Sequence, residues 1–403
     1  MMRTKILFIS LFAILLFQMG CTEPYEIETL NYESVLVVES TITDEMKPQI
    51  VKLSKTSTLE NPEIIYENNA SVSVSSSAGD NFNFSQNSET GFYVSNQPFS
   101  AQPNVDYALN IITQDGRRYK SSAVNLTSSV AMDDVYIDRI ISPTDNKDGV
   151  QILVNTEDLT GNAKYFRYEY EETYKIVAPT PTPYYTELAN YNPDNGTYDV
   201  ILTPREPEVI CYSSEISTGI TQTTTTELNE NRVFRFPVRH LSKLDPKIQT
   251  RYSILVKQYV QSVDAFTFYK IVKELGSVES LLSQGQPGYV TGNMVSEANP
   301  DEKVLGFFEA SSMTSKRIYF NYEDAGLEKP PYFVDCEVLF LDYNDNTVLD
   351  NDPDERQILY DLISSNEYQI IGANSRLIYR IVKSECSVCT YFSSNVKPDF
   401  WED

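Results

Sequence analysis

Histidine is almost absent from this chain of 403 residues, which contains a single one, His240. A Ser-His or Cys-His catalytic pair would have to use this imidazole, and a zinc site could draw on no second histidine. Val238 to Leu241 resemble the end of a strand, so we interpret His240 as structural. The chain also contains no G-x-S-x-G, P-loop or H-E-x-x-H motif. We therefore expect neither enzyme activity nor a cofactor.

Positive charge is scarce as well, because 32 Lys and Arg residues stand against 57 Asp and Glu, for a net charge of −25. Binding to nucleic acid needs clustered Lys and Arg that replace the counterions of the phosphate backbone. The composition therefore excludes nucleic acid as a partner, and it excludes attachment to anionic lipid head groups through a basic surface. Solubility is a sufficient reason for the excess of acid.

Long apolar runs are missing too. The run from Ile6 to Phe17 is about twelve residues long, whereas a helix that spans a membrane needs ~20. Arg3 and Lys5 precede it and Gly20-Cys21 closes it, which is typical of a lipoprotein signal peptide.

We predict that residues 1–21 are such a signal and that cleavage leaves Cys21 as the acylated first residue. Gln18 departs from the pattern, because an aliphatic residue is usual three places before the cysteine. One acyl chain such as palmitate binds a membrane only marginally, so stable anchoring requires the several chains of a bacterial lipoprotein. Loss of Arg3 and Lys5 would bring the net charge to −27.

An acidic tether follows over residues 22–33, beginning Thr-Glu-Pro-Tyr-Glu-Ile-Glu. Acidic residues directly behind a lipidated cysteine resemble the export signal that sends Bacteroidota lipoproteins to the outer face of the outer membrane. We therefore expect a lipid-anchored protein of the outer membrane that faces the cell exterior.

Four further cysteines are Cys211, Cys336, Cys386 and Cys389. An even set in an exported protein indicates disulfides, with three connectivities open. The C-x-x-C spacing at Cys386 to Cys389 also suits a redox pair or half a zinc site, but no helical pattern follows it and a second ligand pair is missing. We favour two disulfides that join this C-terminal pair to Cys211 and Cys336.

The composition favours strands, because 28 Tyr, 19 Phe and many Val, Ile and Thr fall in short runs. We predict a mainly β chain whose N-terminal domain, residues 34–126, is a seven-stranded immunoglobulin-like or transthyretin-like sandwich. Asp115-Gly116 is a strong hairpin signal within it. The seven strands are expected at residues 35–41, 49–55, 70–76, 81–85, 91–95, 107–113 and 118–124.

A larger β-rich domain is expected over residues 127–403, closed by the cysteine-rich tail. Two amphipathic helices are predicted in it, Asp264 to Leu275 with Asp264 as the N-cap, and Asp354 to Ser364. Its strands are expected at residues 135–141, 150–155, 165–177, 233–238, 252–260, 304–310, 316–322 and 377–382.

A tyrosine-rich stretch interrupts the strand pattern for about twenty residues after Pro179. Tyr184, Tyr185, Tyr191 and Tyr198 suit a contact loop for a glycan or peptide ligand, because tyrosine combines a large rigid ring with a polar tip. The alternative, which we favour, is a hairpin that packs on the sandwich with tyrosines filling its base.

An acidic segment begins with Asp342, Asn344 and Asn346, the alternating oxygen ligands of a calcium loop. The match then fails, because Thr347 stands where such a loop needs Gly and Pro353 replaces the bidentate acid. Calcium is thus a weak candidate, and a solvated turn is the preferred interpretation.

Several stretches together resemble a Bacteroidota lipoprotein family described as a domain of unknown function, DUF4249. They are Cys21-Thr-Glu-Pro, Val35-Leu-Val-Val-Glu39, Tyr252 to Tyr259, Ala265 to Tyr269, Gly292-Asn293 with Asn299-Pro300, Val304 to Phe308, Cys386 to Cys389, and Lys397 to Trp401.

The resemblance implies no catalytic residues. It implies a role as an accessory lipoprotein beside a TonB-dependent outer-membrane receptor, by association alone. Trp401 matches the family, and we expect Phe400 and Trp401 to pack the tail against the second domain. We therefore expect a non-catalytic accessory or ligand-capturing partner of such a receptor. The alternatives are a surface glycosidase-like hydrolase with paired carboxylates and an adhesin-like structural lipoprotein.

Overall fold

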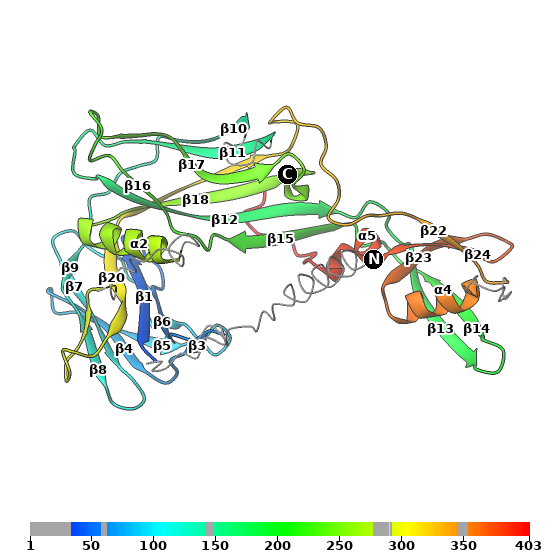
Figure 1. The fold of residues 1–403 in the computed structure, drawn as a ribbon, viewed down its shortest axis with the longest axis horizontal. Coiled ribbons are helices and arrows are strands. Elements are labelled where there is room, and N and C mark those ends of the chain that lie inside the picture. The colour runs from blue at the N-terminus through cyan, green and yellow to red at the C-terminus, as the bar shows by residue number, and fades with distance from the viewer. Residues whose placement is uncertain (1–33, 58–62, 142–147, 277–289, 291, 345–353) are drawn as a thin grey trace, which may run out of the picture.

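The chain is mainly β, as the sequence predicts, and its strands form three groups (Figure 1). The computed structural model describes residues 34–57, 63–141, 148–276, 290, 292–344 and 354–403. Among these residues no helix is both long and apolar enough to cross a membrane. Cys21, the signal peptide and the tether lie outside them.

The first group is one eleven-stranded sheet in the order β19-β8-β7-β4-β5-β6-β2-β1-β20, with β3 beside β2 and β9 beside β7. Alternating residues of these strands face one core, as in β7, where every second residue is buried. The bounds are β1 Leu36–Thr43, β2 Ile50–Lys55, β3 Ile65–Tyr66, β4 Ser71–Ser76, β5 Asn81–Gln86, β6 Tyr93–Ser95, β7 Asp106–Ile112, β8 Arg118–Ser121, β9 Val124–Asn125, β19 Met294–Ser296 and β20 Val304–Ser311.

Two strands of this sheet, β19 and β20, come from the second half of the chain. The predicted N-terminal domain of seven strands within residues 34–126 therefore does not describe the whole sheet. All seven predicted strands are present. However, β20, which we assigned to the larger domain, pairs in parallel with β1, from Leu36 beside Val304 to Thr43 beside Ser311. Local alternation identifies a strand but not a partner so distant in sequence, which is the reason for the error.

Two glycines allow the backbones at this edge to approach closely. A Cβ atom on Gly306 would lie 2.1 Å from the carbonyl oxygen of Val38, and one on Gly292 would lie 1.6 Å from that of Gly306. The side-chain amide of Asn293 donates to the Phe308 carbonyl oxygen (2.7 Å) and accepts from the Phe308 amide (2.8 Å). Asn293 therefore links the segment that leads into β19 with β20.

The second group is a sandwich of two antiparallel sheets that share one core. One sheet has the order β10-β11-β17, and the other β15-β12-β18-β21 with β16 beside β12. The bounds are β10 Asp134–Ile141, β11 Asp148–Glu157, β12 Tyr165–Val177, β15 Ile210–Ile216, β16 Thr221–Thr224, β17 Arg232–Ser242, η1 Pro246–Ile248, β18 Tyr252–Val260 and β21 Met313–Phe320.

The chain passes directly from β20 of the first sheet to β21 of the sandwich, with only Ser312 between the two strands. Hydroxyl groups hold the backbone at this crossing. Thr127 donates to the carbonyl oxygen of Val260 (2.7 Å) and accepts from the amide of Ser312 (3.0 Å), while Ser311 donates to the same carbonyl (2.6 Å). Buried backbone groups that cannot join a ladder need such partners.

Helix α2 (Val263–Leu275) lies between the first sheet and the sandwich (Figure 1). Its N-cap is Ser262, whose hydroxyl accepts from the amide of Ala265, so our assignment of Asp264 as the cap is wrong. The side chain of Asp264 is thus left outside the capping bond.

The third group lies at the end of the molecule away from α2 (Figure 1). The hairpin β13-β14 and the sheet β22-β24-β23 pack with helix α4 around a small core. Asp354 caps α4 as expected. The bounds are β13 Tyr184–Asn192, β14 Thr197–Pro204, β22 Leu339–Asp342, α4 Glu355–Ser364, β23 Tyr368–Ala373, β24 Ile378–Lys383, α5 Ser384–Ser387 and η2 Cys389–Tyr391.

Two disulfides join the C-terminal cysteine pair to Cys211 and Cys336, as the sequence analysis favours. Cys211 pairs with Cys389, and Cys336 with Cys386. The first bond links β15 of the sandwich to η2 at the C-terminal end of the third group. The cysteine pair therefore ties the third group to the sandwich.

The tail also packs on the sandwich. Trp401 is buried, with its ring edge-to-face against Tyr212 and Tyr319, as expected. Phe400 is different, because it is 41% exposed and lies under the guanidinium group of Arg317.

We predict that Gly306→Ala destabilises the fold by at least about 2 kcal/mol, because the new methyl group would meet the Val38 carbonyl and push β20 away from β1. Urea unfolding followed by tyrosine fluorescence measures the change. The matched control is Gly219→Ala, since a Cβ atom there meets no atom within 4 Å. Equal stability of the two variants would contradict the assigned β1-β20 contact.

We also predict that a peptide map under non-reducing conditions yields two cross-linked pairs, one joining Cys211 to Cys389 and one joining Cys336 to Cys386. Because these bonds close long stretches of chain, their reduction is expected to cost about 2–5 kcal/mol of stability. A bond between Cys386 and Cys389, or free thiols in the unreduced protein, would refute the pairing.

Candidate functional site

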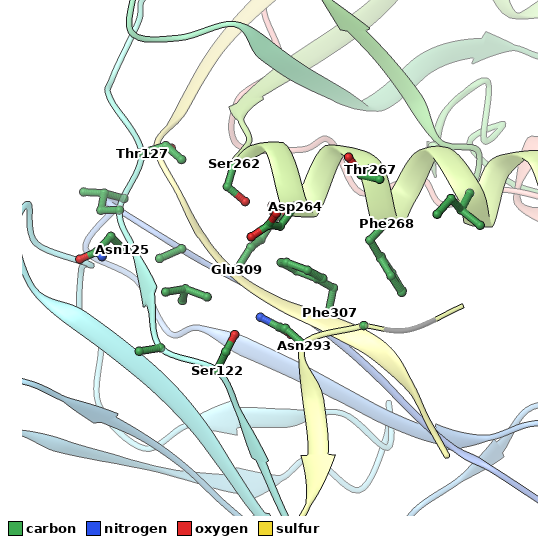
Figure 2. Close-up of a pocket in the computed structure, with 16 residues that line it drawn as sticks. Ser122, Asn125, Thr127, Ser262, Asp264, Thr267, Phe268, Asn293, Phe307 and Glu309 are labelled. Carbon is green, nitrogen blue, oxygen red and sulfur yellow. The ribbon is translucent and has the colours of Figure 1, made fainter. Parts of the chain in front are cut away.

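A cavity of about 670 Å³ lies where the first sheet meets the sandwich. Its walls come from the N-terminal half of α2, from β20, and from the segment 122–127 that leaves the first sheet (Figure 2). Its volume is typical of small-molecule sites. The cavity is therefore the candidate functional site.

One wall is built by packing of α2 on β20. Phe268 of α2 lies 5.5 Å from Phe307 of β20 between ring centroids, and both side chains are more than nine-tenths buried. The helix forms here because a capped first turn is followed by apolar residues at helical spacing. Two phenyl rings thus supply the apolar part of the lining.

The polar lining has spare hydrogen-bonding capacity. Within the described part of the chain, the carboxylate of Asp264, the amide of Asn125 and the hydroxyl of Ser122 make no hydrogen bond, and all three residues are exposed. In Figure 2 they surround the cavity from α2 and from the opposite segment. These groups are open to a ligand.

Glu309 also lines the cavity but is buried and already engaged. Its Oε1 accepts from Thr41 (2.9 Å) and from the Arg167 guanidinium group (2.8 Å), whereas Oε2 has only a long contact with Gln261 (3.5 Å). One oxygen of this carboxylate is thus committed to the fold.

Arg167 connects three parts of the molecule at this point. It belongs to β12 of the sandwich, pairs with Glu309 of β20, and also pairs with Glu169. The rings of Tyr259 and Tyr269 lie 4.5 and 5.0 Å from its guanidinium carbon. Burial by itself would lower the pKa of Arg167, but the carboxylates of Glu309 and Glu169 together with the neighbouring tyrosines outweigh burial and raise it. Arg167 therefore stays charged behind the cavity and fastens the sandwich to the first sheet.

A second buried carboxylate, Glu172, lies within the sandwich. It accepts from Arg239 (3.0 Å), from Lys247 (2.6 Å) and from the hydroxyl of Tyr252. Burial would raise the pKa of the Glu172 carboxyl, but these donors lower it. A carboxylate held ionised by two cations is typical of a structural ion pair and unlike a general acid.

The predicted tyrosine loop is a β-hairpin, β13-β14, so the expectation of a stretch without secondary structure is wrong. The alternative that we favoured, a packed hairpin, is correct as to the hairpin. However, this hairpin packs on α4 and β23 and not on the sandwich. Tyr198 is buried and donates to the Arg356 carbonyl oxygen (2.8 Å). Tyr184 is partly buried, while Tyr185 and Tyr191 are 59% and 42% exposed.

Contact with a partner through this hairpin would thus fall to Tyr185 and Tyr191. Tyr185 lies beside the guanidinium group of Arg205, and Tyr191 lies against Tyr360 of α4. Both rings already have neighbours in the fold. Their hairpin, β13-β14, lies at the end of the molecule away from α2 (Figure 1).

The weak calcium candidate lies only partly within the described residues. The carboxylate of Asp342 accepts from the amide of Asn344 (2.9 Å), and the Asn344 side chain donates to the carbonyl of Arg376 (2.8 Å). Asn346 lies outside the described residues. No group of three or more His, Cys, Asp or Glu side chains suited to a metal occurs in the part of the chain that the structure describes.

His240 lies on β17 opposite Gln151 and is partly buried. Its Nδ1 has no hydrogen-bond partner among the described residues. It does not line the cavity, so it offers no base to the site.

The sequence patterns assign a binding role to no residue of the cavity or of the Arg167 cluster, although Asp264 is named there as a helix cap and Asn293 and Phe307 belong to the stretches that carry the family resemblance. One signal in the sequence could have pointed to Arg167. It lies inside a strand, next to the aromatic residue Phe166, and its neighbours in that strand are buried. A charged side chain at such a position needs a buried partner. The partner on β20 could not be named, since it depends on the pairing of β1 with β20.

A comparison with protein families found a match to the family described as Domain of unknown function (DUF4249), over residues 22–317. The match spans the first sheet, most of the sandwich and the whole cavity lining. A comparison with curated proteins found no match.

We predict that Arg167→Met lowers the free energy of unfolding by about 3–5 kcal/mol, because it leaves Glu309 buried without its cation. Urea unfolding measures the change. The double variant Arg167→Met with Glu309→Gln is expected to recover part of the loss, since the amide keeps an acceptor for Thr41 without a charge. Strictly additive losses would show that the two side chains do not interact.

Proposed function

This chain belongs to the DUF4249 family, whose function is unassigned, and on that premise we propose that it is a non-catalytic lipoprotein of the outer membrane. Acylated Cys21 anchors it, facing the cell exterior. It acts as the accessory or ligand-capturing partner of a TonB-dependent receptor.

The observation that carries the proposal is the cavity at the junction of the first sheet and the sandwich. It is of small-molecule size and combines two phenyl rings with polar groups that have no hydrogen-bond partner among the described residues. Such a mixture suits binding, because apolar walls supply affinity and a few polar groups fix orientation.

The membrane location is supported by the sequence and by the cysteines. The signal pattern ends at Cys21, and the four other cysteines form two disulfides, as is common in oxidising compartments outside the cytoplasm. A lipid anchor beside a receptor raises the effective concentration of a captured ligand at that receptor.

The rival function is that of a hydrolase with a pair of catalytic carboxylates, since Asp264 and Glu309 both line the cavity. A glycosidase needs one carboxyl group with a raised pKa that donates a proton. Glu309 is instead bound to Arg167 and Thr41. Binding is the better-supported function.

We predict that mild detergent extraction of native membranes, followed by affinity capture of the full-length protein and mass spectrometry, recovers an outer-membrane receptor barrel with it. Metabolic labelling with a palmitate analogue should mark the parent protein. The matched variant Cys21→Ala should carry no label and should recover at least about tenfold less barrel, because it lacks the lipid that holds it at the membrane.

Recovery of the labelled lipoprotein without any barrel would refute the accessory role. Absence of label from the parent protein would refute the anchor.

A further inference from the structure

We propose that the junction cavity binds a small polar molecule that carries a protonated amine, and that the carboxylate of Asp264 receives the amine. This inference rests on the proposed binding function and names the chemical class of its ligand.

The charge of the lining favours a cation. Among the described residues, the ionisable side chains that line the cavity are Asp264 and Glu309, and no Lys, Arg or His is part of this lining. Arg167 lies behind Glu309 and pairs with one of its oxygens. An anionic ligand would therefore meet the free carboxylate of Asp264, whereas an ammonium group is attracted by it; the charge of Glu309 is largely offset by Arg167.

Asp264 is the group that is free to make this contact. It lies in the first turn of α2, and its carboxylate has no hydrogen-bond or ion-pair partner among the described residues, because Ser262 caps the helix in its place. A carboxylate–ammonium hydrogen bond at a partly enclosed site is stronger than a neutral one.

Glu309 supplies the second acceptor. Its Oε1 is held by Thr41 and Arg167, so the carboxylate cannot turn away from the cavity without breaking both contacts. Its Oε2 retains acceptor capacity, since it has one long contact at 3.5 Å. The carboxylate is thus preorganised by the same ion pair that joins the first sheet to the sandwich.

The remaining free groups require a ligand with further polar atoms. The amide of Asn125 can both donate and accept, and the hydroxyls of Ser122 and Ser262 can donate. Figure 2 places Asn125 and Ser122 across the cavity from Asp264. A molecule with hydroxyl or amide groups on the side opposite its amine satisfies both walls.

The net charge of the whole protein also favours a cationic ligand over an anionic one. Its net charge of −25 repels anions and concentrates cations near the surface. A volume of about 670 Å³ suits a molecule of the size of an amino sugar or a dipeptide.

The test uses glucose and two sugars that each differ from glucose in one group, an amine in one and a carboxylate in the other. Full-length protein in detergent micelles is titrated with glucosamine, glucose and glucuronate, and binding is measured by calorimetry and by ligand-observed NMR. Glucosamine is expected to bind about tenfold more tightly than glucose, because it adds one charged hydrogen bond, and glucuronate is expected to bind more weakly than glucose.

Three variants locate the site. Asp264→Asn is expected to remove the preference for glucosamine over glucose without unfolding α2, since Ser262 provides the cap. Ala123→Trp is expected to abolish binding of all three sugars, because Ala123 is an exposed residue of the lining and a large side chain there fills the opening. The matched control Asp194→Asn removes one exposed charge in the distant β13-β14 turn and should change nothing.

Equal affinity for glucose and glucosamine, no binding of glucosamine at millimolar concentration, or undiminished binding by Ala123→Trp would each overturn the inference. Capture of the receptor barrel is measured on the same preparations. Barrel capture without amine selectivity leaves the proposed function standing and refutes only the ligand class, whereas amine selectivity without the barrel refutes the accessory role.

Discussion

The parallel pairing of β1 with β20 is the constraint on which the rest of the molecule depends. Because β20 passes through Ser312 into β21, one stretch of chain is an edge strand of the first sheet and then an edge strand of the sandwich. This shared passage explains the glycines at 292 and 306, since any larger residue would separate the backbones. It also brings Glu309 to Arg167, and it places α2 over the angle between the two β-structures.

The junction is polar inside, which is costly unless each group is paired. Arg167 and Glu309 pair with each other, while Thr127, Ser311 and Ser312 bond to backbone groups that leave their ladders. The two β-structures are therefore fastened by directional contacts as well as by apolar packing. Such an arrangement holds the cavity walls in place, which favours binding of a small ligand without a large rearrangement.

The third group is attached in a different manner. Its core is separate from those of the first sheet and the sandwich, and the disulfide between Cys389 and Cys211 of β15 holds the adjoining tail to the sandwich. Exposed Tyr185 and Tyr191 belong to this group, at the end of the molecule away from the cavity. The molecule thus has two separate regions, one with the cavity and one with exposed aromatic rings.

The sequence by itself determined the elements whose signals are local. Alternation located all seven N-terminal strands, and helical spacing located α2 and α4. Because Cys21 is assigned to the predicted signal peptide, the other four of the five cysteines form an even set. That set indicated two disulfides but not which cysteines pair with each other. Tertiary structure decided the partner of β20, the packing of the β13-β14 hairpin and every residue of the cavity. The reason is physical, because alternation and capping report on neighbours in the chain. A parallel pairing between residues 36–43 and 304–311, and the Arg167–Glu309 contact that follows from it, depend on backbone approach and burial that arise only when the whole chain has folded.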